Sequence, residues 1–83
     1  MQILYFTAEW CQPCAKFKPV VEAEAQARGV KVEYVDIDSP EGFAKASAVG
    51  IQSVPTLILQ NGQSETRLGA VPASKLRTAL DEL

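Results

Sequence analysis

The stretch Trp10-Cys11-Gln12-Pro13-Cys14 holds both cysteines of the chain, with two residues between them. The apolar run Ile3-Leu4-Tyr5-Phe6 comes just before it, and a segment with helical periodicity follows. Two thiols at this spacing come within bridging distance when the chain turns into a helix. A CxxC pair at a strand-to-helix junction therefore predicts a dithiol/disulfide redox centre.

The alternatives for this cysteine pair are a static disulfide and half of a zinc or iron–sulfur site. The chain contains no histidine, so one copy supplies only two ligands of these kinds. A four-ligand site would need a dimer. The sequence therefore favours redox chemistry and predicts neither a metal nor a cofactor.

Working outward, the cysteine pair lies near the start of a regular alternation of strands and helices. Apolar periodicity and turn residues predict strands at 2–6, 30–37 and 54–59, and a fourth strand from the Asn61-Gly62 turn to about Leu68. Apolar periodicity and capping residues predict three helices. The first covers 11–28 and contains Pro19, the second starts at 38–41 and ends near Gly50, and the third starts at Pro72. The order is βαβαββα. The first crossover makes the first two strands parallel, and the hairpin makes the last two antiparallel. We expect one α/β domain over residues 1–83, with a four-stranded mixed sheet and helices on both faces.

Charge and composition narrow the function classes. The net charge of -2 and the isoelectric point near 5.0 argue against binding to nucleic acid or to an anionic membrane. No apolar run approaches the roughly 20 residues that span a bilayer. The first residues show no secretory signal. We therefore expect a cytoplasmic protein, a compartment where a lone cysteine pair is more often catalytic or metal-binding than structural.

Cys11 is predicted to be the attacking sulfur. It stands at the start of the predicted helix, where free backbone N–H groups and the helix dipole favour a thiolate. Cys14 lies one turn further in and would be the resolving sulfur. Pro13 suits the first turn of a helix, because it lacks an N–H donor.

Several segments in order along the chain carry a family resemblance. They are Ala8-Glu9-Trp10-Cys11-Gln12-Pro13-Cys14, Pro19, Val35-Asp36-Ile37-Asp38, Val49-Gly50-Ile51-Gln52-Ser53-Val54-Pro55-Thr56, Asn61-Gly62 and Gly69-Ala70. On these residues the chain resembles a short thioredoxin without the first strand and helix of the full-length form. The resemblance implies a thioredoxin-like fold, protein disulfides as substrates, a separate recycling reductase that uses NADPH, and a monomer.

The resemblance also implies a docking surface around Cys11. The residues expected to bind substrate are Trp10, Gln12, Pro13, Val54, Pro55, Gly69 and Ala70. Pro55 is expected to be cis, so that the Val54 backbone can pair with an extended target chain. The alternatives are a trans proline and local packing of Trp10. Phe17, Tyr34 and Phe43 are expected in the core.

Four positions depart from the family pattern. Tyr5 stands where thioredoxins usually carry a buried aspartate, and Tyr34 where a lysine usually accompanies it. Gln12 replaces a glycine, and Thr7 replaces an aromatic residue. The departures at Tyr5 and Tyr34 bear on how Cys14 loses its proton.

Two rival functions stay open at this point. A glutathione-dependent, glutaredoxin-like enzyme is one, although Gly69-Ala70-Val71-Pro72 lacks the acidic residue that would pair with the glutathione amine. A non-catalytic binding module with the same fold is the other, and the intact cysteine pair argues against it.

Overall fold

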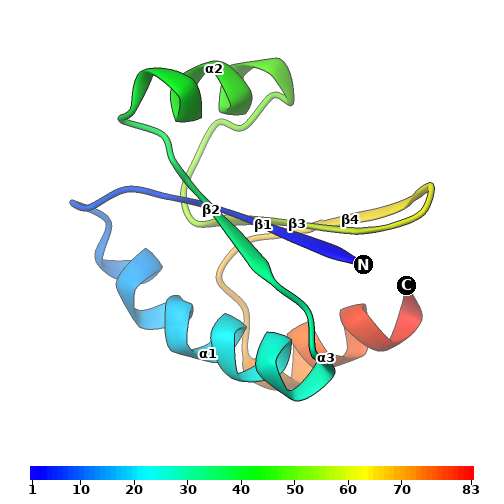
Figure 1. Cartoon of the computed structure of the whole chain (residues 1–83). Helices are drawn as coiled ribbons and strands as arrows, with labels where there is room; N and C mark the ends of the chain where they lie inside the picture. Colours follow the sequence, from blue (N-terminus) through cyan, green and yellow to red (C-terminus); the bar gives the residue numbers. More distant parts are fainter.

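The computed structural model describes all residues from 1 to 83, and its elements follow the predicted order (Figure 1). The elements are β1 (Gln2–Thr7), α1 (Gln12–Arg28), β2 (Val32–Asp36), α2 (Pro40–Ala48), β3 (Thr56–Asn61), β4 (Ser64–Leu68) and α3 (Ala73–Glu82). Pro19 lies inside α1, and Gly29 ends that helix as predicted. The third strand begins two residues later than expected, because Ser53–Pro55 form a bend. None of the three helices combines the length and the apolar character needed to cross a bilayer.

The sheet has the order β2-β1-β3-β4 and is mixed, as predicted. β1 is parallel to β2 and antiparallel to β3, and β3 is antiparallel to β4. Helices α1 and α3 cover one face and α2 covers the other (Figure 1). β1 is therefore a central strand with both faces covered, which explains its continuous apolar sequence.

Alternate residues of β1 pack into two separate hydrophobic cores. Ile3 and Tyr5 belong to a cluster beneath α1 and α3 that also contains both cysteines. Leu4 and Phe6 point to the opposite face and pack with residues of β2, β3 and α2. A strand with a side-chain period of two thus serves both layers, and the larger cluster extends to the sulfur atoms.

Helix α2 lies unusually close to the end of β2. The Ser39 hydroxyl caps the helix by accepting from the Gly42 N–H at 2.9 Å, and it donates to the Asp36 carbonyl oxygen at 2.8 Å. A Cβ atom on Gly42 would lie 1.8 Å from that same carbonyl oxygen. Only glycine permits this approach.

Two of the three aromatic residues expected in the core are not buried there. Phe17 is buried, whereas the exposed fraction is 43% for Tyr34 and 65% for Phe43. Tyr34 is exposed because β2 is an edge strand, with no further strand beyond it. Phe43 is exposed because Gly42 and Ala46 form the packed side of α2.

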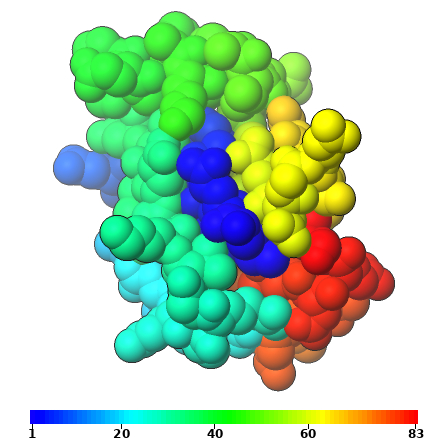
Figure 2. Space-filling view, turned by 45° about the vertical axis from the view of Figure 1, so that its right-hand side comes forward, coloured from blue at the N-terminus to red at the C-terminus, as the bar shows by residue number.

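The β3–β4 hairpin closes the sheet near both ends of the chain. Asn61 pairs with Ser64, so Gly62 and Gln63 form the loop, one residue later than the Asn-Gly pattern implies. Gly62 has φ of 63°, which suits the first position of a tight hairpin turn. Figure 2 shows the start of the chain in blue beside the yellow hairpin, with the red C-terminal helix below it. The Asn61 side chain donates to the Leu83 carbonyl oxygen at 3.4 Å. The cysteine pair is at the opposite end of the sheet.

Candidate active site

The two cysteines form a disulfide across the first turn of α1. Their Cα atoms are 5.2 Å apart. Cys11 is the N-cap residue, with extended backbone angles, and its Sγ accepts from the Cys14 N–H at 3.2 Å. Pro13 occupies the first turn. The N-cap position of α1 thus puts Cys11 Sγ at a backbone donor and at the positive end of the helix dipole.

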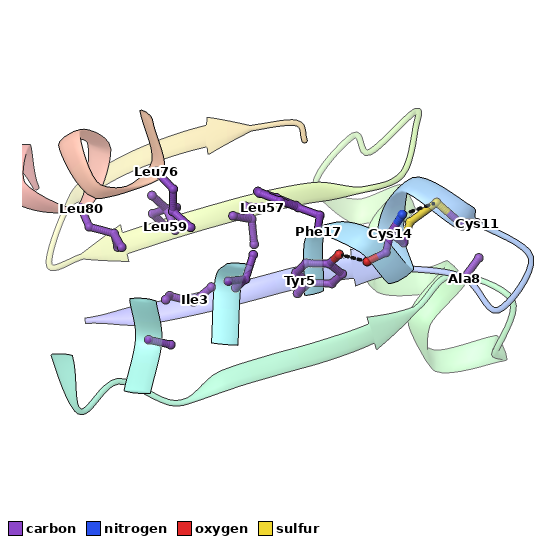
Figure 3. Packing of buried hydrophobic residues seen from close by; sticks show 12 residues of the cluster. Ile3, Tyr5, Ala8, Cys11, Cys14, Phe17, Leu57, Leu59, Leu76 and Leu80 are labelled. Carbon is purple, nitrogen blue, oxygen red and sulfur yellow. Dashed lines mark hydrogen bonds between the residues drawn. A yellow bond between two sulfur atoms is a disulfide. The ribbon is translucent and has the colours of Figure 1, made fainter. Parts of the chain in front are cut away.

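Both sulfur-bearing residues lie largely beneath the surface. The exposed fraction is 5% for Cys11 and 2% for Cys14 in this oxidised form. Both belong to the cluster that contains Tyr5, Ala8 and Phe17 (Figure 3). The two cysteines are therefore largely shielded from solvent in this form.

Tyr5 connects β1 directly to the second cysteine. Its hydroxyl donates to the Cys14 carbonyl oxygen at 2.5 Å, as the dashed line in Figure 3 shows. The Tyr5 ring lies 6.1 Å from the Phe17 ring and 5.8 Å from the Tyr34 ring, measured between centroids. Burial, and secondarily the charge of Glu22, raises the pKa of Tyr5 to about 12. The hydroxyl is therefore a donor at neutral pH.

A polar array lies on the outer side of Tyr34. The Tyr34 hydroxyl donates to Glu22, and the Lys18 ammonium lies 5.1 Å from the centroid of the Tyr34 ring. Burial, followed by the hydrogen bond and charge of Glu22, raises the pKa of Tyr34 to about 12. The Lys18 side chain thus contacts the Tyr34 ring.

An apolar groove lies between α2 and Trp10, the residue that precedes Cys11, and we call it the Trp10–Phe43 groove. Its volume is about 160 Å³, and its lining residues are Trp10, Ile37, Phe43, Ala46, Ser47, Ile51, Gln52, Ser53 and Val54. Trp10 is 66% exposed, and its indole Nε1 donates to Asp38 Oδ2 at 2.8 Å. This hydrogen bond fixes the indole at one edge of the groove.

The other residues expected to bind substrate do not line the Trp10–Phe43 groove, and two of them line a second depression. Pro13 and Ala70 line an open depression with Phe17, Val20 and other residues of α1 and the β4–α3 connection. Gln12 is exposed and lines neither. The Val54–Pro55 bond is cis, as expected, and Pro55 is buried. A Cβ atom on Gly69 would lie 3.9 Å from the Pro55 carbonyl oxygen, so these two segments are adjacent.

The sequence reasoning missed the contributions of Phe43 and Asp38. Phe43 is exposed, whereas the buried residues of α2 are Gly42 and Ala46, and these two small residues give no sequence signal of which side of the helix is packed. From sequence, Asp38 belongs to a predicted helix start and to one of the segments that carry the resemblance, and neither gives it a contact in the site. No pattern in the sequence indicates its bond to Trp10, since 28 residues separate them.

This arrangement defines a class of protein: α/β proteins with a mixed sheet, a cysteine pair at the N-terminus of a helix, and a cis-proline loop. The Thioredoxin family model matches residues 1–82. The chain is 42% identical over 79 residues to thioredoxin 1 of Synechococcus elongatus, covering 93% of this chain and 74% of that one. It is 41% identical over 73 residues to a thioredoxin of Rhodospirillum rubrum, covering 86% and 70%.

Solved structures agree with these sequence matches. Oxidised thioredoxin O1 of Arabidopsis thaliana has a TM-score of 0.79 and 34% identity, over 99% of this chain and 76% of that one. Thioredoxin O2 of the same plant, also oxidised, has a TM-score of 0.85 and 27% identity, over 99% and 73%. The chain belongs to the thioredoxin family. Its Cys11–Cys14 pair makes it a thiol-disulfide oxidoreductase that reduces protein disulfides.

Proposed function

We propose that Cys11 attacks the substrate disulfide and that Cys14 resolves the mixed disulfide. The observation that supports this assignment is the N-cap position of Cys11, whose Sγ accepts the Cys14 N–H at 3.2 Å. A sulfur at this position is favoured as a thiolate, which is the nucleophile in disulfide exchange. Cys14 is the more deeply buried of the two.

The reaction then has two exchange steps. The Cys11 thiolate attacks one sulfur of the target, the target disulfide breaks, and its other sulfur leaves as a thiolate. The Cys14 thiol gives its proton to water and attacks Cys11 Sγ, which releases the second target thiolate and closes Cys11–Cys14. The protein loses two electrons and the target gains them.

We propose that the Trp10–Phe43 groove receives an apolar side chain of the target next to its disulfide. The groove includes Trp10, which directly precedes Cys11, and has six apolar residues among nine, with two exposed aromatic rings. Val54 and Pro55 would hold the target backbone in extended form by strand pairing. Pro13, Gly69 and Ala70 would contact the target on the other side of Cys11, with Gln12 exposed between the cysteines.

Further features of the proposal concern the setting of the reaction. Family members are recycled by a reductase, and we propose that this one uses NADPH. We propose that residues 1–83 act as one domain and as a monomer in the cytoplasm, contributing to electron transfer and thiol balance there. The acidic isoelectric point near 5.0 supports neither a nucleic-acid nor an anionic-membrane partner.

We expect this protein to reduce protein disulfides without glutathione. The measurement is the loss of disulfides in a protein substrate, with NADPH and a thioredoxin reductase in one arm and glutathione with glutathione reductase in the other. We expect turnover in the first arm and little in the second. Turnover only with glutathione would instead support the glutaredoxin-like alternative.

Removing the ring of Phe43 is expected to lower activity on protein disulfides but not on small disulfides. Loss of an aromatic contact at the centre of an interface costs about 1–2 kcal/mol, so Phe43→Ala should lower kcat/KM for a protein disulfide roughly 5- to 30-fold. The rate with a small disulfide should stay unchanged, because that substrate does not reach the groove. Phe43→Leu keeps an apolar side chain and should retain most activity. An equal loss with both substrates would contradict a docking role.

A further inference from the structure

The resolving cysteine is attached to the sheet by one side-chain hydrogen bond. The Tyr5 hydroxyl donates to the Cys14 carbonyl oxygen at 2.5 Å, from the middle of the central strand (Figure 3). Tyr5 is 1% exposed. The bond therefore joins two parts of the molecule that solvent does not reach, in the first turn of the helix that carries both sulfurs.

The Tyr5 ring itself is fixed from several sides. Phe17 of α1 and Tyr34 of β2 pack against it, with centroid distances of 6.1 and 5.8 Å. Leu57 of β3 is its register partner on the other neighbouring strand. A rigid ring can hold its hydrogen-bond partner in place at little further entropic cost.

We propose that Tyr5 is a positioning residue for the resolving step: its hydroxyl holds the Cys14 backbone so that Cys14 Sγ stays directed at Cys11 Sγ after the disulfide between them has opened. The inference rests on the proposed roles of Cys11 and Cys14. In the mixed disulfide nothing covalent keeps the two sulfurs together, so the closing rate depends on how well the first turn of α1 is held.

The surroundings of Tyr5 identify its hydroxyl as a donor rather than a proton acceptor. The charged and titratable groups near its ring are Glu22 and Lys18 of α1, Tyr34 and Asp36 of β2, and Glu9 before α1. Burial and Glu22 raise the pKa of Tyr5 to about 12. The hydroxyl therefore keeps its proton throughout the range in which thiols titrate, and its bond to Cys14 does not change with pH.

The test separates the two exchange steps with dithiobis(nitrobenzoate) in excess over the reduced protein. Attack by Cys11 releases one coloured thiolate at a rate that rises with reagent concentration. Attack by Cys14 on the Cys11 mixed disulfide releases the second at a rate independent of reagent concentration. Tyr5→Phe should leave the first rate unchanged and slow the second roughly three- to tenfold, the loss of one hydrogen bond. The ratio to the parent rate should be constant between about pH 6 and pH 9.

The matched control is Tyr34→Phe, the same change at the register partner of Tyr5 on β2. The Tyr34 hydroxyl donates to Glu22 and not to the first turn of α1, so both rates should equal those of the parent. Should Tyr5→Phe fail to fold, para-aminophenylalanine and para-fluorophenylalanine at position 5 serve instead. The amino group retains an N–H donor and should close faster than the fluoro form.

Four results would overturn the inference. If the second rate is the same with and without the donor, or if both steps slow equally, Tyr5 only supports the fold. If the ratio changes with pH, Tyr5 exchanges protons with Cys14 and does more than position it. A parent protein whose first mixed disulfide maps to Cys14 would overturn the proposed cysteine roles as well, whereas the other results leave those roles intact.

Discussion

Cys14→Ser is expected to accumulate a mixed disulfide between Cys11 and a protein substrate, whereas Cys11→Ser is expected to accumulate almost none. In the first variant the attacking sulfur at the N-cap of α1 is intact and the resolving sulfur is absent, so the reaction stops after one exchange. In the second variant the nucleophile is absent. Both variants should lose turnover on protein disulfides by a factor on the order of 10³ or more, the scale for removing a nucleophile.

The measurement is gel mobility without reductant, followed by peptide mapping of the trapped species. Cys14→Ala is the matched control, because it also lacks the resolving sulfur but buries no hydroxyl in the apolar cluster around Cys14. It should trap as much as Cys14→Ser. In the reduced parent protein, limited alkylation should label Cys11 well before Cys14. Equal trapping by the Cys11 and Cys14 variants, or faster labelling of Cys14, would show that the two roles are assigned wrongly.

The order and topology of the elements could be predicted because a local sequence pattern indicates each helix and strand. The apolar run of β1 indicates a strand covered on both faces, and its residues do divide between the two cores. Ser39 before Pro40 marks the start of α2, and the Asn61-Gly62 pair marks the hairpin. The position of the cysteine pair at a helix start follows from the same local signals.

Features that depend on packing between distant segments could not be predicted. The aromatic character of Phe43 predicts a core position, but Gly42 packs against the Asp36 carbonyl oxygen and the adjacent Phe43 is left 65% exposed at the edge of the groove. Composition alone cannot show which side of a short helix is packed. The Trp10–Phe43 groove depends on that orientation, so sequence reasoning found only Trp10 and Val54 of its lining.

Tyr5 illustrates both outcomes at one position. Its location near the inner cysteine could be predicted from the family pattern, although that pattern has an aspartate there, and the structure places Tyr5 against Cys14. Its hydrogen bond to the Cys14 carbonyl could not be predicted, because that bond depends on the distance between β1 and the first turn of α1. Position 5 is therefore where a substitution should affect both stability and chemistry.

Tyr5→Asp is expected to destabilise the protein by about 4 kcal/mol or more at neutral pH. The substitution removes a ring that is 1% exposed and packs against Phe17 and Tyr34, and loss of a buried aromatic side chain costs about 3–5 kcal/mol. It also places a carboxyl group in an apolar cluster, where the charged form is strongly disfavoured. Lys18 contacts the Tyr34 ring, with its ammonium 5.1 Å from the ring centroid, so the new carboxyl would have to draw it away from that contact. Small domains have about 5–15 kcal/mol of stability, so part of the variant should be unfolded.

The destabilisation should depend on pH in one direction. Burial raises the pKa of the new carboxyl in the folded state above its value of about 3.9 in the unfolded chain. Between these two values the folded state binds more protons than the unfolded state, so stability falls as pH rises. The difference from the parent protein should therefore be smallest below about pH 4 and should grow until the folded carboxyl has ionised, by about 1.4 kcal/mol for each unit of pKa shift.

Urea melts of oxidised parent and variant proteins at a series of pH values measure this difference directly. Tyr34→Asp is the matched control on the neighbouring strand, where the side chain is 43% exposed and a carboxylate stays hydrated. It should cost much less than Tyr5→Asp and show little added dependence on pH. Asn at position 5 has the size of Asp without its charge, so Tyr5→Asn should be destabilised by a constant amount across the series. If Tyr5→Asp and Tyr5→Asn were equally stable at every pH, the new carboxyl would lie in water, and position 5 would not be buried beside the inner cysteine.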